Sequence, residues 1–501
     1  MEEKQEEAAA VINMKFKISI ILVFICSFSF SQQIKTNDST STYKKRVLET
    51  TEVDFLMSYY QQEGNHASVT GGIGNEKLTD ITPTFIVAIP LSDDNVLTVD
   101  AGISAYSSAS SSNLDPFDSS GASGGGDDDD DDDDDDSGVS STKGSPWVES
   151  SGASAQDVWG GINASYSHSS NDRNSIWSAN VGFATEYDYT SIGFGGGFTK
   201  LFNEKNTEFG IKAQVYLDTW SPRYPTELDS YIEANQNLNN GFFSDIDILN
   251  QSGNIIDKNG SDIWSPLNTT LIDDKGRNSY SVSFSFSQIL SKNAQFSIFL
   301  DLVQQSGWLA NPMQRVYFED RDNYYVGNAS NIPIYTTKQN TGVFQLADDI
   351  ERLPDSRFKI PIGTRFNYYI NESVAVRTYY RFYTDDWGLT SHTASLEIPI
   401  KFGLGKFTFY PNYRFYNQTQ SDYFAPFDEH LSTSEFYTSD YDLSKFDSHQ
   451  YGLGFKYTDI FTKFKIFNFG LKTFDLRYSY YDRSDGLQSS IISAGFKFTL
   501  D

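Results

Sequence analysis

Ten consecutive aspartates form the most chemically distinctive segment of the 501-residue chain. Carboxylate oxygens are the ligands that Ca²⁺ and Mg²⁺ prefer, but an ordered site needs ligands at spaced positions and a turn glycine. Because adjacent like charges repel, we expect an extended, solvated tract that holds divalent cations loosely. Cation capture at a channel mouth and docking of a basic partner are the alternatives. The tract consists of Asp127, Asp128, Asp129, Asp130, Asp131, Asp132, Asp133, Asp134, Asp135 and Asp136.

A second set of charged side chains recurs at alternate positions within predicted strands. Even positions of 358–370 are mostly apolar, whereas odd positions include Lys359 and Arg365. If the apolar face contacts lipid, the basic side chains face a barrel lumen, because charge on the lipid face is strongly disfavoured. There they either pair with luminal acids or a plugging loop, or attract an anionic solute. This lumen basic row comprises Arg365, Arg377, Arg381, Lys401, Arg414 and Arg477.

Three motifs rich in glycine, aromatic and polar residues fall beside predicted strand ends, near 64–74, 304–312 and 385–392. Their candidate rim motif is His66 with Asp385 and Asp386, which could meet as a small metal or ligand site. Tight turns and aromatic girdle positions are the simpler interpretation. The sequence has no Gly-x-Ser-x-Gly elbow, no His-Glu-x-x-His motif and no Cys–His pair. We therefore predict that the chain is not an enzyme.

The N-terminal region has the pattern of an export signal. Two lysines precede an apolar stretch at 18–30, and small serines suit a cleavage before Gln32. The apolar stretch is too short to span a bilayer. We predict a signal peptide at 1–31, with the true start at Met14, and a short periplasmic segment at 32–50.

Composition supports an exported membrane protein. Aromatic residues make up 15% of the chain, and the net charge is −29. Aromatic richness in a chain that is polar on average fits lipid-facing aromatics around a wet lumen. The acidic charge disfavours nucleic acid as a partner. The only cysteine, Cys26, lies within the export signal, so the mature chain is expected to have no disulfide and no Cys-ligated metal.

Segments of about ten residues with alternating apolar and polar positions recur along the chain, as in transmembrane β-barrels. They predict about sixteen strands, an even number, as single-chain bacterial barrels have. The predicted strands lie at 52–62, 80–90, 96–107, 157–168, 175–187, 190–202, 207–219, 278–290, 295–306, 357–370, 373–385, 390–402, 406–419, 448–460, 472–483 and 489–500.

The connections between these strands sort by length. Every second connection is short, apart from a longer one at 460–471, whereas the long segments all fall between the others. Short periplasmic turns and long extracellular loops are typical of outer-membrane barrels. The segment 108–156, rich in Ser, Gly and Asp, is predicted to be a disordered external loop. The other long connections lie at 63–79, 220–277, 307–356 and 420–447.

The loop motifs resemble those of a family of outer-membrane proteins common in Bacteroidota and known only as a domain of unknown function. The resemblance spans roughly 45–501 and implies a barrel in the outer membrane, with no catalytic residues to carry over. Because members are often encoded near thioredoxin-like proteins and flavin-attaching enzymes, it also implies an extracytoplasmic redox or metal-handling role. The motifs that carry it are 55–62, 64–78, 307–312, 381–383, 385–388 and 391–393.

The sequence thus predicts an all-β, up-and-down transmembrane barrel at 51–501, embedded in lipid and lipopolysaccharide. We expect a channel or uptake protein for a small solute or cation, with no required cofactor and with Ca²⁺ or Mg²⁺ held loosely at the aspartate tract. The alternative is a structural barrel that anchors a periplasmic or surface protein and whose lumen is plugged by its own loops. The solute and the oligomeric state do not follow from the sequence.

Overall fold

The computed structural model describes residues 46–108, 156–186, 188–221, 224–244, 246–267, 275–335, 343–459 and 461–500. All of them belong to one compact unit, Arg46–Asp501. The predicted signal peptide, the start at Met14, most of the 32–50 segment and the loop predicted at 108–156 lie outside the described residues.

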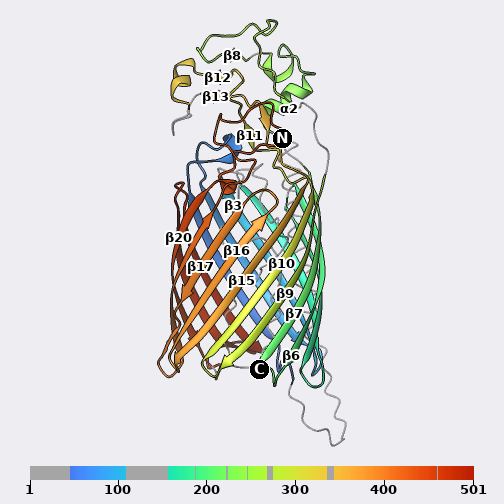
Figure 1. The fold of residues 1–501 in the computed structure, drawn as a ribbon, viewed down its shortest axis with the longest axis vertical. Coiled ribbons are helices and arrows are strands. Elements are labelled where there is room, and N and C mark those ends of the chain that lie inside the picture. Colours follow the sequence, from blue (N-terminus) through green and yellow to red (C-terminus); the bar gives the residue numbers. More distant parts are fainter. Residues whose placement is uncertain are drawn as a thin grey trace, which may run out of the picture. The chain divides into compact units, whose positions relative to one another are not determined.

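The described chain forms a closed antiparallel barrel of sixteen strands, as the alternating pattern predicted (Figure 1). Each strand pairs with its neighbours in sequence, and the last pairs with the first, so the sheet has no free edge. The barrel strands are β1 (Glu52–Glu63), β2 (Leu78–Pro90), β3 (Asn95–Ser108), β4 (Gln156–Ser169), β5 (Ser175–Thr185), β6 (Tyr189–Phe202), β7 (Thr207–Trp220), β9 (Lys275–Ser291), β10 (Ala294–Gly307), β15 (Ser356–Asn371), β16 (Val374–Asp385), β17 (Thr390–Glu397) continued by β18 (Ile400–Phe402), β19 (Phe407–Gln418), β20 (Phe446–Thr458), β22 (Phe469–Arg483) and β23 (Gln488–Leu500).

One predicted strand, 390–402, is interrupted. Pro399 separates β17 from β18, because proline has no N–H for the ladder and is disfavoured inside a strand. The backbone N–H of Ile398 still donates to the carbonyl of Pro411 on β19, so the wall remains continuous at the interruption. β17 and β18 therefore count as one position in the ring.

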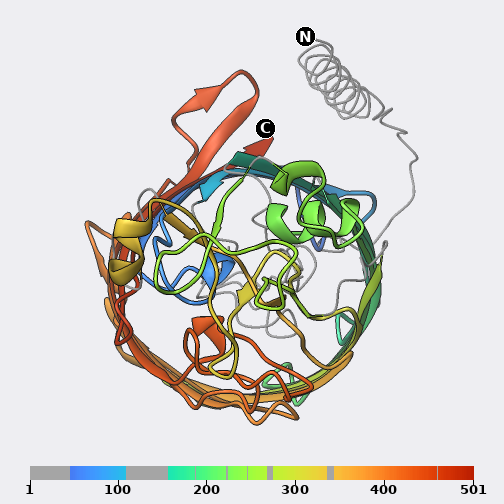
Figure 2. The same cartoon turned by 90° about the horizontal axis from the view of Figure 1, so that it is seen from above.

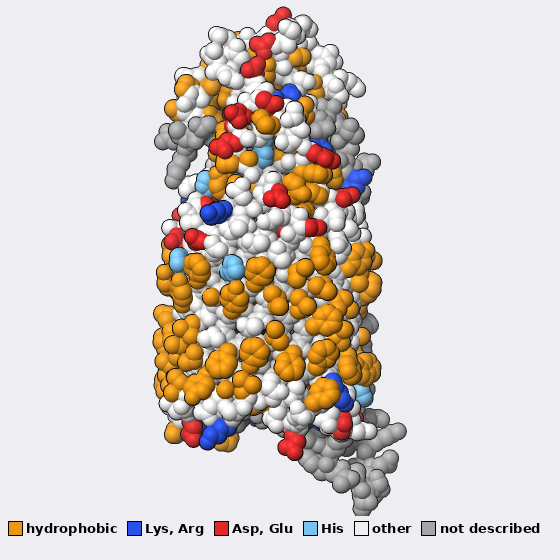
Figure 3. Space-filling model, viewed as in Figure 1, with side chains coloured by type: hydrophobic (Ala, Val, Ile, Leu, Met, Phe, Trp, Pro, Cys, Tyr) orange, Lys and Arg blue, Asp and Glu red, His pale blue; other side chains and the backbone are white. Residues whose placement is uncertain are grey.

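The two faces of the barrel differ in polarity. Side chains on the outer face are large, apolar and exposed, such as Phe85, Val181, Ile362 and Leu453. Figure 3 shows this apolar band around the wall, between two zones in which charged side chains appear. An exposed apolar belt on a closed sheet is the lipid-facing surface of a membrane barrel. Among the described residues, no helix is long and apolar enough to cross a membrane.

The long connections fold together into a cap above one end of the barrel (Figures 1 and 2). The largest of the cap's small hydrophobic cores packs Tyr231, Phe243, Trp264 and Tyr317 together. We call these segments the cap, consisting of the described residues of 64–77, 221–274, 308–355, 386–389, 419–445 and 484–487. Its regular elements are η1 (Ser68–Thr70), α2 (Thr226–Glu233), η3 (Gly241–Phe243), β8 (Ile248–Leu249), β11 (Arg315–Val316), β12 (Tyr325–Gly327), η4 (Ala329–Ile334), β13 (Val343–Gln345), β14 (Asp349–Ile350) and η5 (Tyr441–Leu443).

The assignment of faces predicts opposite effects for two adjacent positions in β5. Val181 is 57% exposed on the outer face, whereas Asn180 pairs with the buried, lumen-facing Ser165. We expect Val181→Arg to lower the free energy of unfolding by about 2–4 kcal/mol near the bilayer midplane. Asn180→Arg should have a much smaller effect. Urea unfolding in lipid vesicles would measure both, and equal destabilisation would contradict the assignment.

Candidate functional site

The arginines of the predicted lumen basic row lie on the inner face of one wall. Strand register places Arg365 beside Tyr379, Arg381 beside the buried Thr393, and Arg414 beside Ser395. Paired residues of adjacent strands share a face, so these side chains point into the lumen. Lys401, in β18, lies in an exposed stretch near the short-turn end, opposite Thr408.

The arginines of this row form a paired network. The Arg377 Nη1 lies 3.0 Å from Oε1 of Glu397, and Nη1 of Arg477 lies 3.8 Å from the second oxygen of the same carboxylate. Arg477 also contacts Asp475, with 3.0 Å between its Nε and Oδ1. Arg365 stacks over the ring of Tyr379, 5.6 Å from its centroid. At Arg377 and Arg477, the cations of this wall are therefore paired with acids rather than isolated.

Large lumen-facing side chains lie flat against the wall over glycines of a neighbouring strand. The ring of Tyr216 covers Gly193, and a Cβ added there would lie 2.6 Å from Cε1 of the ring. In the same way the ring of Phe299 covers Gly363, with Cζ 2.2 Å from an added Cβ. Glycine alone leaves room for this close approach. The large side chains are thereby held out of the lumen. Comparable pairs are Gln214 over Gly195, Asn412 over Gly452, and Trp159 over Gly161 within β4.

Loops from opposite sides of the barrel meet in the cap. The β1–β2 loop and the β10–β15 loop arise eight strands apart in the ring of sixteen, which is the largest separation available. Nevertheless Arg315 Nη1, in the second loop, donates to the carbonyl of Val69 in the first at 2.7 Å. The ring of Tyr317 packs against Gly71, where an added Cβ would lie 2.6 Å from Cε2. These contacts require the loops to cross over the barrel mouth.

Arg315 joins three loops and is the central brace of the cap. Besides Val69, its guanidinium binds both carboxylate oxygens of Glu227 in α2, at 2.6 and 3.0 Å. It also lies over the ring of Phe344, 5.0 Å from the centroid. Bidentate pairs of this kind are short and directional. Both side chains are largely buried, so each depends on the other for its charge to be compensated.

Carboxyl groups inside the cap are shifted away from ionisation. Burial raises the pKa of Asp348 to about 7, although Arg321 lies 3.5 Å away and lowers it. Burial also raises the pKa of Asp440 well above its ordinary value. A cation site needs ionised carboxylates. Asp348 and Asp440 are therefore poorly suited to bind a metal ion.

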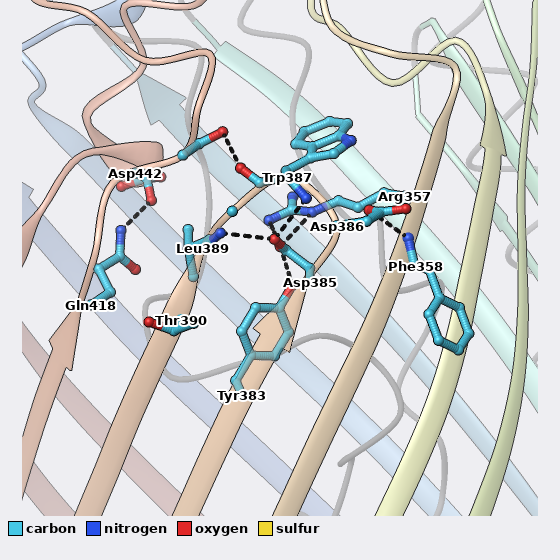
Figure 4. Close-up of polar contacts among 12 residues, drawn as sticks. Arg357, Phe358, Tyr383, Asp385, Asp386, Trp387, Leu389, Thr390, Gln418 and Asp442 are labelled. Atoms are coloured by element: carbon cyan, nitrogen blue, oxygen red, sulfur yellow. Dashed lines mark hydrogen bonds and ion pairs between the residues drawn. The ribbon is translucent and has the colours of Figure 1, made fainter.

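At the barrel rim, Asp385 is the centre of a dense hydrogen-bond cluster (Figure 4). Its Oδ2 accepts from the guanidinium of Arg357, at 2.5 Å from Nη2, and from the hydroxyl of Tyr383 at 2.7 Å. Its Oδ1 accepts from the backbone N–H groups of Trp387 and Leu389, both at 3.0 Å. The Arg357 guanidinium in turn stacks on the Trp387 ring, 4.3 Å from the centroid. The cluster latches the β16–β17 turn onto β15.

The structure does not bring the three residues of the predicted rim motif together. Asp386 is exposed and accepts one hydrogen bond, from the N–H of Phe358 at 2.9 Å. His66 instead stacks on Tyr441 and its Nδ1 lies 3.0 Å from the carbonyl of Gly72. Within the described ranges, no three His, Cys, Asp or Glu side chains cluster as metal ligands. Protein donors already occupy both oxygens of Asp385, and a small metal or ligand site at this rim stays a prediction.

One predicted site cannot be placed in the structure, and some residues of the site were not predicted from the sequence. The aspartate tract 127–136 lies outside the described residues. Conversely, sequence reasoning missed the brace of Arg315 and Glu227 and the part played by Arg357. Arg357 is an odd position directly before 358–370, and the odd positions of that strand were predicted to face inward, so its inward orientation could have been predicted. No local pattern marks Arg315.

Comparisons with known proteins identify a family for the chain. The sequence model of a family described as "Protein of unknown function (DUF3570)" matches residues 19–494. No curated protein matches the chain. A bacterial polysaccharide outer membrane secretin aligns with a TM-score of 0.41 at 9% identity, over 90% of this chain and 99% of its own. OccK7 (OpdD) of Pseudomonas aeruginosa aligns with a TM-score of 0.35 at 11% identity, over 90% and 98%. The toluene transporter TodX of Pseudomonas putida gives 0.34 at 8% identity, over 90% of each chain.

Proposed function

This chain belongs to the DUF3570 family of proteins of unknown function, and we propose that it is an outer-membrane channel for small hydrophilic solutes, closed at rest by its cap. The observation that carries the proposal is that large aromatic rings pack flat against the lumen wall. Tyr216 and Phe299 lie flat over glycines on adjacent strands instead of projecting inward. A barrel that served only as an anchor would gain nothing from packing these rings against its wall.

The chemistry of the lumen suits a polar solute. On β9, the inward positions are serines from Ser279 to Ser287, each a small group that can donate and accept hydrogen bonds. The next part of the wall, from β15 to β22, offers the guanidinium groups of the basic row, balanced by acids such as Glu397. A hydrated solute that carries both hydrogen-bond donors and acceptors can replace its bound water with these side chains at little cost in free energy.

The cap supplies the gate in this proposal. Because the β1–β2 and β10–β15 loops cross over the mouth and are held by Arg315, a solute passes only when these loops separate. The aspartate tract 127–136 and a metal or redox role stay part of the proposal as an external collector of divalent cations. That part rests on the charge of the tract and on the family resemblance.

A second candidate function is a barrel that anchors a periplasmic or surface protein, with its mouth kept permanently shut. The same bracing of opposite loops favours it, since a permanent plug would also be held by buried ion pairs. The two functions differ in one measurable respect. A channel conducts ions once the cap is removed, whereas an anchoring barrel with an occluded lumen does not.

Planar-bilayer recordings test the proposal. Wild-type barrels should conduct rarely, and a chain in which a short turn replaces 308–355 should conduct steadily. In that trimmed chain, Gly161→Ala should reduce the single-channel conductance, because the added methyl displaces the Trp159 ring, now 2.6 Å away, from the wall. The overpacking is also expected to destabilise the barrel by about 1–3 kcal/mol.

The adjacent glycine provides a matched control. A Cβ at Gly160, which belongs to the lipid-facing parity of β4, meets no atom within 4 Å. Gly160→Ala should leave the conductance unchanged. Absence of current from folded, trimmed barrels would reject the channel and favour the anchoring function, and equal conductance of the two glycine variants would show that the packing of rings against the wall does not affect conduction.

A further inference from the structure

A small hairpin leaves the barrel at the end that carries the short turns. β21 (Lys465–Ile466) pairs with the beginning of β22, so that Ile466 lies opposite Phe469. Asp459 closes the loop before it, since its side chain accepts from the N–H groups of Phe461 and Lys463. Figure 2 shows this orange-red hairpin standing out from the circular wall. We call residues 461–471 the interfacial hairpin.

The interfacial hairpin exposes an unusual amount of apolar surface. Phe467 is 93% exposed at its tip, and Phe461 is 77% exposed. Phe464 and Ile466 are 58% and 45% exposed. Contiguous exposed aromatics of this kind mark an interaction surface rather than an ordinary water-facing turn. The surface needs an occupant that accepts apolar rings.

Strand register makes this surface continuous with the lipid-facing belt. Ile466 lies opposite Phe469 on β22, and Phe469 lies opposite Leu500 on β23. Directly paired residues share a face, and Leu500 belongs to the apolar outer parity of its strand. The hairpin thus extends the surface that already contacts lipid, outward from the wall. A protein docked from below would instead meet the turn ends.

The charges of the hairpin fit the same occupant. Lys463 and Lys465 are exposed and alternate with the phenylalanines along 461–467. Aromatic rings at the depth of lipid headgroups with lysines that reach phosphate are the pattern of interfacial anchors. No acidic residue lies within 461–471 to oppose a negatively charged lipid surface.

We propose that the interfacial hairpin inserts its aromatic side chains into the periplasmic leaflet of the outer membrane, with Lys463 and Lys465 at the phosphates of phospholipid headgroups. Held in the leaflet in this way, the hairpin fixes how deep the barrel lies in the membrane and how it is rotated, at the end that carries the short turns. This role is independent of whether the lumen conducts.

A depth measurement on the full chain tests the proposal. In a Cys26→Ser background, a Phe467→Cys variant carries an environment-sensitive fluorophore, and the barrel is folded into vesicles of zwitterionic and anionic phospholipid. We expect blue-shifted emission and stronger quenching by spin labels near the headgroup than by labels deep in the acyl chains. Glu204→Cys, in the exposed β6–β7 turn at the same end, should show water-like emission and severalfold weaker quenching. Asn468→Cys gives a second labelling position if the first variant folds poorly.

The remaining outcomes overturn the proposal. Emission at position 467 that matches the Glu204→Cys control would show that the hairpin stays in water and awaits a periplasmic protein. A blue shift that depends on protein concentration and is accompanied by cross-links between barrels would assign the surface to a second copy. Quenching that persists in Phe461→Ser/Phe464→Ser would show that the aromatics do not place the hairpin.

Discussion

Replacing Arg315 with methionine is expected to open the barrel mouth. The substitution keeps an unbranched apolar stem but removes the guanidinium that joins the three loops carrying Val69, Glu227 and Arg315 itself. Loss of one partner of a buried ion pair destabilises the structure around it by about 3–5 kcal/mol. If the closed cap depends on this pair, the closed-to-open ratio falls by about two to four orders of magnitude.

Single-channel recording measures the open fraction directly, and limited proteolysis reports whether the loops have loosened. Lys258→Met is the matched control, because the Lys258 ammonium binds the carbonyls of Phe243 and Ser244 within a single loop. It should leave the open fraction near that of the wild type. If Arg315→Met loosens the loops to protease without raising the current, the cap is not the gate.

Asp385→Asn is expected to cause the largest loss of stability in the barrel itself. The Asp385 carboxylate is fully buried and the Arg357 side chain only 10% exposed. The amide keeps the shape of the side chain, but it leaves the buried guanidinium without its counter-charge and turns one acceptor into a donor. We expect the free energy of unfolding to fall by about 3–5 kcal/mol. The β16–β17 turn should fray first.

Urea unfolding of the folded barrel in detergent or vesicles gives the measurement. Asp386→Asn is the adjacent control, since Asp386 is exposed and accepts only the backbone N–H of Phe358. A single exposed hydrogen bond contributes about 1 kcal/mol or less. If the two variants were equally destabilised, the ion pair of Arg357 with Asp385 would not contribute to the stability of the β16–β17 turn.

The strands were predictable from sequence because their signal is local. Alternation with period two marks each strand, and all sixteen predicted segments overlap a strand of the barrel. The interruption at Pro399 was not predicted, since the 390–402 segment was expected to be one continuous strand. Parity along each strand also placed Arg365 and Arg381 on the inner face, since only neighbouring residues decide it.

The cap was not predictable in the same way, because its contacts are remote in sequence. Arg315 binds Glu227 across 88 residues and Val69 across 246. No periodicity encodes such a contact. The pairing of Phe299 with Gly363 likewise depends on the register between β10 and β15, which one strand's pattern does not reveal. In the same way, the spacing of the rim motif did not show that Arg357 from β15 would pair with Asp385.

The pairing of β1 with β23 decides whether the sheet can close. Glu52 pairs with Thr499, and Leu500 donates to the carbonyl of Thr51, so the cylinder is completed by residues from opposite ends of the chain. Without β23, the sheet would present two unpaired edges, at β1 and β22, which are prone to pair with other chains. A chain that lacks β23 would therefore form an open sheet rather than a smaller barrel.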